Sequence, residues 1–281
     1  MKSIWWMLGG VLLILLLLVT FLYIVYSILF QSRWVIKLIA KYEKRAFFYF
    51  DTKERVIALT IDDSPSNQTE QFVALLKQYN AHATFFVIGD RIKEREEKLI
   101  QIVEAGNEIG NHTLHDEPSF KNTPTEFAEK VLQTDTLIEE ATRGQKYKWF
   151  RPGSGLPSSF MFDTIDNLNY RMVIGSNYAF DAQTDNTTFT SFLLRHSVSN
   201  GSIVVCHDRP YNIAEVENFL QYCQKNHIEV LSLGEMAERV YNSQPFKMDV
   251  PIPTHFFSQF ALGTPDELST ETVKEPIMPH L

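Results

Sequence analysis

The chain has little cysteine and no excess of positive charge. Its 281 residues include two cysteines, Cys206 and Cys223, which are too few for a disulfide framework. The formal net charge of −8 argues against nucleic acid as a partner, because phosphates require a basic protein face. The sequence also has no internal repeat. With 44% hydrophobic residues, it fits a globular protein with one sizeable domain or two small ones.

Charge is missing altogether from one long segment near the N-terminus. Residues 3–32 contain no Asp, Glu, Lys or Arg, and about 20 apolar residues span a bilayer as a helix. The apolar region of a cleaved signal peptide is shorter, roughly 7–15 residues, and ends in a small-residue cleavage site. Residues 21–30 offer no such site. We therefore expect residues 1–32 to be an uncleaved single-pass anchor that contacts the membrane through residues 4–30.

Residues 33–50 mix basic and apolar side chains. This pattern predicts an amphipathic juxtamembrane segment that rests on lipid headgroups. Lys2 is the only charged residue before the span, whereas Arg33, Lys37, Lys41 and other basic residues follow it. The positive-inside rule therefore favours a cytoplasmic position for the rest of the chain.

Strand and helix patterns alternate after about residue 50. We expect strands at 56–61, 84–88, 108–110, 149–151, 170–175, 202–206 and 228–233, and helices at 69–79, 92–105, 125–141 and 214–226. Repeated strand–helix units imply a parallel sheet, and about seven of them favour a closed or nearly closed barrel. The predicted fold is α/β, a distorted (β/α)7-type barrel over residues 51–244, preceded by one transmembrane helix. Residues 245–281 contain several prolines and are expected to form an irregular tail.

Side chains suited to catalysis follow several of these strands. Active residues of such a barrel belong at the carboxyl ends of strands. Asp62 and Asp63 end the apolar run 56–61, where carboxylates are costly unless a metal or a reaction uses them. An Asp-Asp-Ser-Pro-Ser turn is the ordinary alternative for this motif. The other segments are 112–116, 151–155, Asp181 and His207.

The order of these segments resembles the polysaccharide deacetylase family, which is also called carbohydrate esterase family 4 or the NodB homology domain. The resemblance covers about residues 54–240 and implies a NodB/TIM-like barrel that hydrolyses an N-acetyl amide. It implies that Asp62 is the general base and that Arg151 holds it in place. His207 would be the acid that protonates the leaving amine, oriented by Asp181. Asp185 competes with Asp181 for that role.

The resemblance also implies a divalent metal, zinc or a similar ion such as cobalt, with Asp63 and His112 as ligands. The family's next ligand is a histidine four residues after the first. In this chain Asp116 stands at that position, and His115 comes one residue early. We expect Asp116 to be the third ligand, with His115 as the alternative.

Three further residues are expected to contact substrate. The backbone N–H near Ser154 would face the oxyanion, Gly155 belongs to the same segment, and Val205 would line the pocket for the acetyl methyl group. The chain departs from the family pattern at Ser64, where the family has glycine. It departs again at Gly153 and Ser154, where the family has proline and an aromatic residue.

The predicted function is a membrane-anchored, metal-dependent deacetylase for amino sugars of a polysaccharide or glycoconjugate, of the chitin or peptidoglycan type. Three alternatives stay open. They are an amidohydrolase for a small non-sugar amide, an enzyme for a lipid-linked amino sugar, and a glycan-binding protein without catalysis. The family's usual substrates lie outside the cytoplasmic membrane, so the resemblance implies an extracytoplasmic domain and opposes the charge rule.

Overall fold

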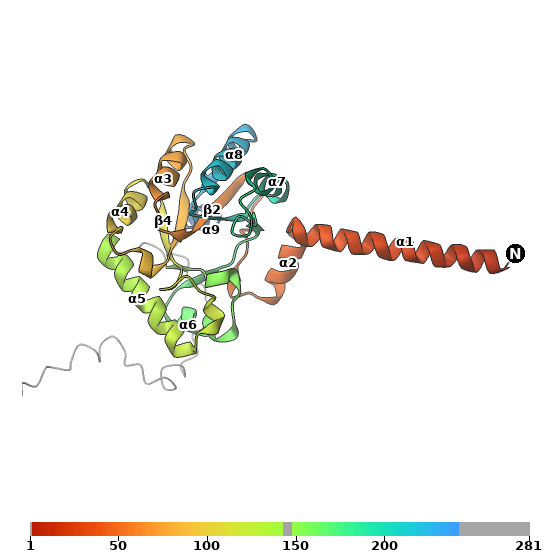
Figure 1. Ribbon diagram of the computed structural model, residues 1–281, viewed down its shortest axis with the longest axis horizontal. Helices are drawn as coiled ribbons and strands as arrows, with labels where there is room; N and C mark the ends of the chain where they lie inside the picture. The colour runs from red at the N-terminus through yellow and green to blue at the C-terminus, as the bar shows by residue number, and fades with distance from the viewer. Residues whose placement is uncertain (1, 143–147, 242–281) are drawn as a thin grey trace, which may run out of the picture. The chain divides into compact units, whose positions relative to one another are not determined.

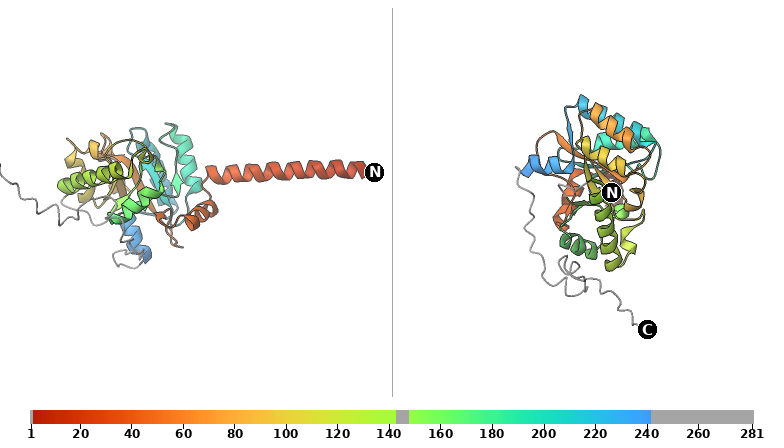
Figure 2. Two further views of the ribbon diagram at one scale, coloured as in Figure 1. Left: turned by 90° about the horizontal axis from the view of Figure 1, so that it is seen from below. Right: turned by 90° about the vertical axis from the view of Figure 1, so that its left-hand side faces the viewer.

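The computed structural model describes residues 2–142 and 148–241. A parallel sheet lies at its centre with helices around it (Figures 1 and 2). In the described residues the sheet has nine strands in the order β1-β6-β5-β4-β3-β2-β8-β7, and β9 also pairs with β2. The strands are β1 Ala46–Phe47, β2 Val56–Ser64, β3 Ala83–Val87, β4 Glu108–Asn111, β5 Trp149–Phe150, β6 Arg171–Val173, β7 Asn177–Tyr178, β8 Ile203–His207 and β9 Glu229–Leu231.

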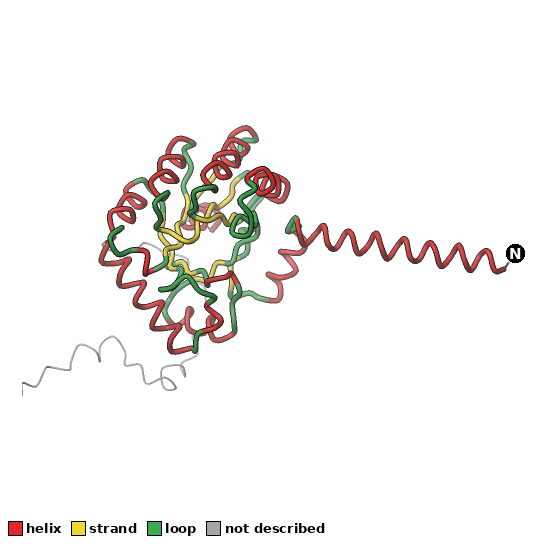
Figure 3. The backbone as a smooth tube through the Cα atoms, viewed as in Figure 1, coloured by secondary structure: helices red, strands yellow, loops and turns green. Residues whose placement is uncertain are grey.

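The sheet is strongly curved, as the tube view shows (Figure 3). Its edge strands are β1 and β7. An antiparallel bridge from Tyr49 to Ser202 links the segment after β1 to the start of β8, and Phe50 N donates to Gly201 O at 2.8 Å. The result is a half-barrel of parallel strands, which confirms the predicted α/β barrel class.

Strand β2 is buried on both faces, as its continuous apolar sequence predicts. Ile57, Leu59 and Ile61 face one core cluster, together with residues of helices α3 and α8. Val56 and Ala58 face another cluster, with residues of other strands and of α9. Because side chains alternate along a strand, the even-numbered residues 60 and 62 continue the second face. A charged group at the end of that face therefore enters the hollow of the sheet.

The helices that surround the sheet follow the strands in the chain. They are α3 Thr69–Gln78, α4 Glu96–Glu104, α5 Pro124–Thr142, α6 Ser159–Asn167, α7 Thr187–Ser197, α8 Asn212–Lys225 and α9 Leu233–Tyr241. Three short 3-10 helices lie in loops: η1 Gly89–Arg91, η2 Ser119–Lys121 and η3 Gly153–Gly155. The sequence patterns predicted α3, α4, α5 and α8 to within a few residues, but α6, α7 and α9 were missed.

Two helices precede the sheet. Helix α1 spans Lys2–Leu29, and its stretch Gly9–Leu29 is long and apolar enough to cross a membrane. Helix α2, Arg33–Tyr42, buries Ile36 against the domain. Strand β1 lies within the segment 33–50 that was predicted to be juxtamembrane, yet it pairs with β6. The sheet therefore begins at Ala46 and not after residue 50. The predicted tail, residues 245–281, lies outside the described residues.

Candidate active site

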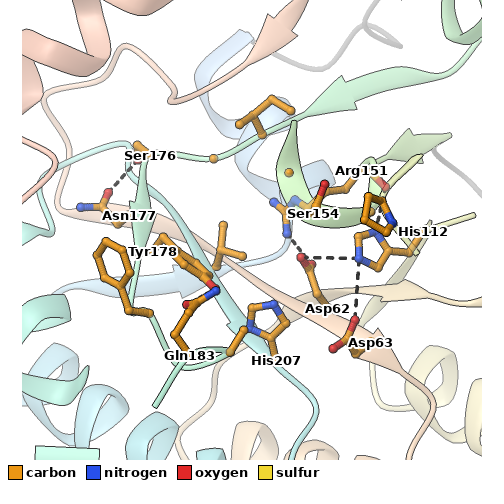
Figure 4. A pocket seen from close by; sticks show the side chains of 18 of the residues that line it. Asp62, Asp63, His112, Arg151, Ser154, Ser176, Asn177, Tyr178, Gln183 and His207 are labelled. Atoms are coloured by element: carbon orange, nitrogen blue, oxygen red, sulfur yellow. Dashed lines mark hydrogen bonds and ion pairs between the residues drawn. The ribbon is translucent and has the colours of Figure 1, made fainter. Parts of the chain in front are cut away.

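The predicted site residues come together at the carboxyl ends of neighbouring strands (Figure 4). Asp62 on β2 and His207 on β8 are partners in the strand register. His112 follows β4, and its N–H donates to Val87 O on β3 at 2.9 Å. Arg151 follows β5 and donates in the same way to Asn111 O at 3.1 Å. Parallel pairing thus delivers side chains from distant parts of the chain to a single edge of the sheet.

Asp62 is held by a buried arginine. Arg151 Nη1 lies 2.5 Å from Asp62 Oδ1 and 2.8 Å from Thr60 Oγ1. The guanidinium carbon lies 4.2 Å from the centre of the Phe86 ring. Burial lowers the pKa of Arg151, and the neighbouring Asp62 carboxylate opposes that effect. Oδ1 is therefore committed to the ion pair, while Asp62 Oδ2 lies on the other side, 3.9 Å from His112 Nε2.

His207 is held by a buried carboxylate. Its Nδ1 lies 2.9 Å from Asp181 Oδ1, and its backbone N–H donates to Asp181 Oδ2 at 2.8 Å. Asn212 Nδ2 also donates to Asp181 Oδ2, at 2.6 Å. Burial lowers the pKa of His207, but the hydrogen bond and the charge of Asp181 outweigh it, so the net pKa is raised. With Nδ1 engaged, Nε2 is the nitrogen that can exchange a proton in the cavity. Asp185 is exposed and does not belong to this pair.

Asp63 and His112 form a second pair, with Nε2 of the histidine 3.8 Å from Asp63 Oδ1. His112 Nδ1 lies 2.7 Å from Arg151 O, so this nitrogen carries a hydrogen, and Nε2 is the nitrogen that can offer a lone pair to a metal once the ring is neutral. Burial raises the pKa of Asp63, but the charges of His112 and His207 and the hydrogen bond from Arg209 outweigh it, so the net pKa is lowered. An ionised carboxylate and a neutral imidazole nitrogen fit two ligand positions of a divalent metal.

The two candidates for the third ligand have other partners. Asp116 Oδ2 lies 2.6 Å from Arg91 Nη2, and His115 Nδ1 contacts the Asp90 carboxylate. Both nevertheless line the same cavity as Asp63 and His112. Among the described residues, three potential ligands already lie close enough to one another to hold a metal. They are Asp181, Cys206 and Glu215, behind His207. A third ligand from 112–116 therefore requires Asp116 or His115 to leave its ion pair.

The expected substrate contacts line a cavity of about 630 Å³, which also contains Asp62 and His207. Ser154, Gly155 and Val205 are all in its wall. This volume is in the usual range for a small-molecule site. Gly153 explains one departure from the predicted motif. A Cβ there would lie 2.1 Å from Glu117 O, so neither proline nor any other residue with a Cβ fits beneath the 112–118 loop.

A family model described as polysaccharide deacetylase matches residues 37–173. The chain contains a polysaccharide deacetylase domain. This places it among hydrolases that act on N-acetyl amide bonds. It is 29% identical over 191 residues to a peptidoglycan-N-acetylglucosamine deacetylase of Bacillus cereus, covering 65% of this chain and 88% of that protein. It is 26% identical to the peptidoglycan-N-acetylmuramic acid deacetylase PdaA of Bacillus subtilis, covering 60% of this chain and 65% of PdaA.

Solved structures support the same fold. The peptidoglycan deacetylase PdaC of Bacillus subtilis aligns with a TM-score of 0.62 and 23% identity, over 66% of this chain and 91% of that one. A family 4 pseudoenzyme from Bacillus anthracis aligns with a TM-score of 0.64 and 20% identity, over 68% of both chains. The half-barrel is thus shared by a deacetylase and a pseudoenzyme, so the fold alone does not determine activity.

Sequence reasoning missed two residues that shape this candidate site. Asp208 is buried and accepts hydrogen bonds from Ser64 Oγ at 3.0 Å, Ser66 Oγ at 2.7 Å and Thr69 Oγ1 at 2.5 Å. Asp208 therefore fixes the turn after Asp63, and the serine that replaces the family's glycine takes part. Arg209 Nη2 lies 2.9 Å from Asp63 Oδ2. The available signal was an adjacent acid–base pair directly after His207 at a strand end.

Proposed function

We propose that this protein is a single-pass membrane-anchored, metal-dependent deacetylase that removes N-acetyl groups from amino sugars. The observation that carries the proposal is the pairing of Asp62 with His207 in register, each backed by a buried partner of opposite charge. The relatives named as deacetylases of peptidoglycan amino sugars support a substrate of that class. Such glycans lie outside the cytoplasm, so the proposal places the domain there, against the charge rule.

The reaction follows from two residue pairs, Asp62 with Arg151 and His207 with Asp181. Asp62, with Oδ1 held by Arg151, takes a proton from water through Oδ2, and the water oxygen attacks the acetyl carbonyl carbon. The resulting oxyanion faces the backbone N–H near Ser154. His207 then donates its Nε2 proton to the sugar nitrogen, the carbon–nitrogen bond breaks, and acetate and a free amine leave. Asp181 stabilises the protonated imidazole before that transfer.

A divalent metal would act as a Lewis acid that polarises the water and the carbonyl. Asp63 and His112 would hold it, with Asp116 as third ligand and His115 as the alternative. Zinc suits this mixture of carboxylate and imidazole ligands, and cobalt is a close substitute. Arg209 hydrogen-bonds Asp63 Oδ2 and leaves Oδ1 directed at His112. The arginine therefore helps to keep the carboxylate ionised and ready for a cation.

Mass spectrometry of N-acetylglucosamine oligomers tests the proposal. The full chain, purified with zinc, should convert them into products that have lost acetyl groups and carry free amines. An Asp62→Asn variant is the matched control, because it keeps the side chain's shape but cannot accept the proton; it should leave the oligomers intact. Oligomers that bind to the wild-type protein without losing acetyl groups would indicate a glycan-binding protein and refute the deacetylase.

A further inference from the structure

The cavity that contains Asp62 and His207 also has an apolar wall. That wall is formed by Ile28, Ile36, Ile39, Phe48 and Ile174. Ile28 lies in the last turn of α1, inside the stretch Gly9–Leu29 that is long and apolar enough to cross a membrane. The cavity therefore reaches from the reacting groups to the end of the candidate membrane span.

Specific contacts attach this wall to the domain. The Gln31 side chain pairs with both backbone groups of Tyr178: Oε1 accepts from its N–H at 2.5 Å, and Nε2 donates to its carbonyl at 2.9 Å. Tyr178 is on β7, so the glutamine occupies the open edge of the sheet as another strand would. Arg33 Nη1 donates to Ser199 Oγ at 3.0 Å. The junction between α1 and α2 is thus fixed to the domain, and its residues Ile28 and Gln31 form part of the cavity wall.

The surface beside this wall suits a membrane interface. Helix α2 leaves Trp34, Leu38 and Ile39 between 44% and 47% exposed, and it carries basic residues as well. Phe192 of α7 is 44% exposed, and its ring centre lies 6.1 Å from that of Phe30 at the end of the α1 segment. Exposed apolar side chains next to basic ones are typical of segments that lie at the headgroup level.

We infer that the substrate is an amino sugar linked to a lipid, with its acetamido group at Asp62 and His207 and its hydrocarbon chain along the isoleucine wall. The inference deepens the proposed function and rests on it. Four of the five wall residues are isoleucines, which offer no hydrogen bonds to sugar hydroxyls and no flat ring for a sugar to stack on; Phe48 is the exception. The wall does offer a place for hydrocarbon, and this place opens where a lipid chain would leave the bilayer.

Alkyl glycosides of N-acetylglucosamine test this inference with the full chain in lipid nanodiscs. The probes are the methyl and the dodecyl glycoside, which share the acetamido sugar and differ in the hydrocarbon chain. We expect kcat/KM to be at least about tenfold higher for the dodecyl compound, because burial of each further methylene group favours binding severalfold. Equal values for the two probes would overturn the inference and leave the deacetylase intact.

A pair of neighbouring variants distinguishes binding of the hydrocarbon chain along the isoleucine wall from simple partition of the glycoside into the bilayer. Ile39 lines the cavity, whereas Leu38, similarly exposed on the same helix, lies outside the lining. Ile39→Gln should abolish most of the preference for the dodecyl glycoside, and Leu38→Gln should retain it. A preference that survives Ile39→Gln would refute binding of the hydrocarbon chain along the isoleucine wall. If wild-type protein deacetylates neither glycoside nor free oligomers, the proposed function itself fails, and the inference fails with it.

Discussion

Asp62 and His207 are register partners on the adjacent parallel strands β2 and β8. Their buried neighbours have opposite charges: Arg151 lies 2.5 Å from the aspartate, and Asp181 lies 2.9 Å from the histidine. Arg151 fixes the position of the Asp62 carboxylate, and the negative charge of Asp181 raises the pKa of His207. One strand pair therefore presents a base and an acid at the same pH, which is the arrangement that amide hydrolysis requires.

Replacing either partner should remove most of the turnover. We expect Asp62→Asn and His207→Gln each to lower kcat by roughly 10²–10⁴-fold, the usual scale of general acid–base catalysis. Metal content, measured by mass spectrometry of the purified variants, should stay at the wild-type level because neither residue is a proposed ligand. A variant with near-normal kcat would remove its residue from the mechanism.

The pH profile should report the Asp181–His207 pair. Asp181 raises the pKa of His207 against the effect of burial. His207 must be protonated to act as the acid, so activity should fall as the pH rises through its pKa. Removing the negative charge with Asp181→Asn should lower that pKa and move the alkaline limb of kcat/KM to lower pH. An alkaline limb at the same pH in wild type and variant would show that His207 is not the group that titrates there.

Metal binding should depend on Asp63 and His112. Their ligand atoms lie 3.8 Å apart, and the histidine already has the tautomer that a metal needs. Asp63→Ala and His112→Ala should each lose most of the bound zinc, as measured by titration calorimetry on protein first stripped of metal. Zinc affinity that is unchanged in both variants would place the metal elsewhere.

The third ligand should be Asp116. Its ion pair with Arg91 is 65% exposed on the aspartate side, and exposed ion pairs contribute about 0–1 kcal/mol, so a divalent metal can displace the arginine. Asp116→Ala should weaken zinc binding more than His115→Ala does. The two dissociation constants decide between the residues, and weakening by the histidine change alone would make His115 the ligand.

Gly153 should tolerate no side chain. An added Cβ would lie 2.1 Å from the backbone of Glu117, so the 112–118 loop would have to move. Gly153→Ala should lower the midpoint of thermal unfolding and weaken zinc binding, since His112 and Asp116 lie on that loop. Gly155→Ala is the control. A Cβ there meets nothing within 4 Å, and only the φ of +66° makes the change costly, by about 1–2 kcal/mol. Equal effects of the two substitutions would contradict the packing argument.

The central strands could be predicted because they are apolar on both faces. The periodicity of β2 and β8 placed Asp62 and His207 at strand ends without any knowledge of the sheet. Strands β1 and β7 have two residues each in the structure, which is too short for a periodic signal. Helix α7 was missed for a different reason: Thr187–Ser197 includes polar residues and β-branched threonines that have low helix propensity.

Partner choice in the loops could not be predicted from sequence. The spacing within 112–116 identified Asp116 and His115 as candidates, but their ion pairs with Arg91 and Asp90 depend on how η1 packs against that loop. The contact of Arg209 with Asp63 joins residues 146 positions apart. Such contacts arise from the parallel register of β2 and β8, which the chain specifies only once the whole sheet has formed.

Acetate release by the full chain shows whether this protein is a metal-dependent deacetylase. N-acetylglucosamine oligomers would be incubated with enzyme that has been treated with a chelator, then with the same enzyme after zinc is restored. We expect chelation to abolish acetate release and zinc to restore it. Acetate release that persists in full after verified metal removal would contradict a metal-dependent deacetylase. So would a zinc-loaded enzyme that releases no acetate from the oligomers or from either alkyl glycoside.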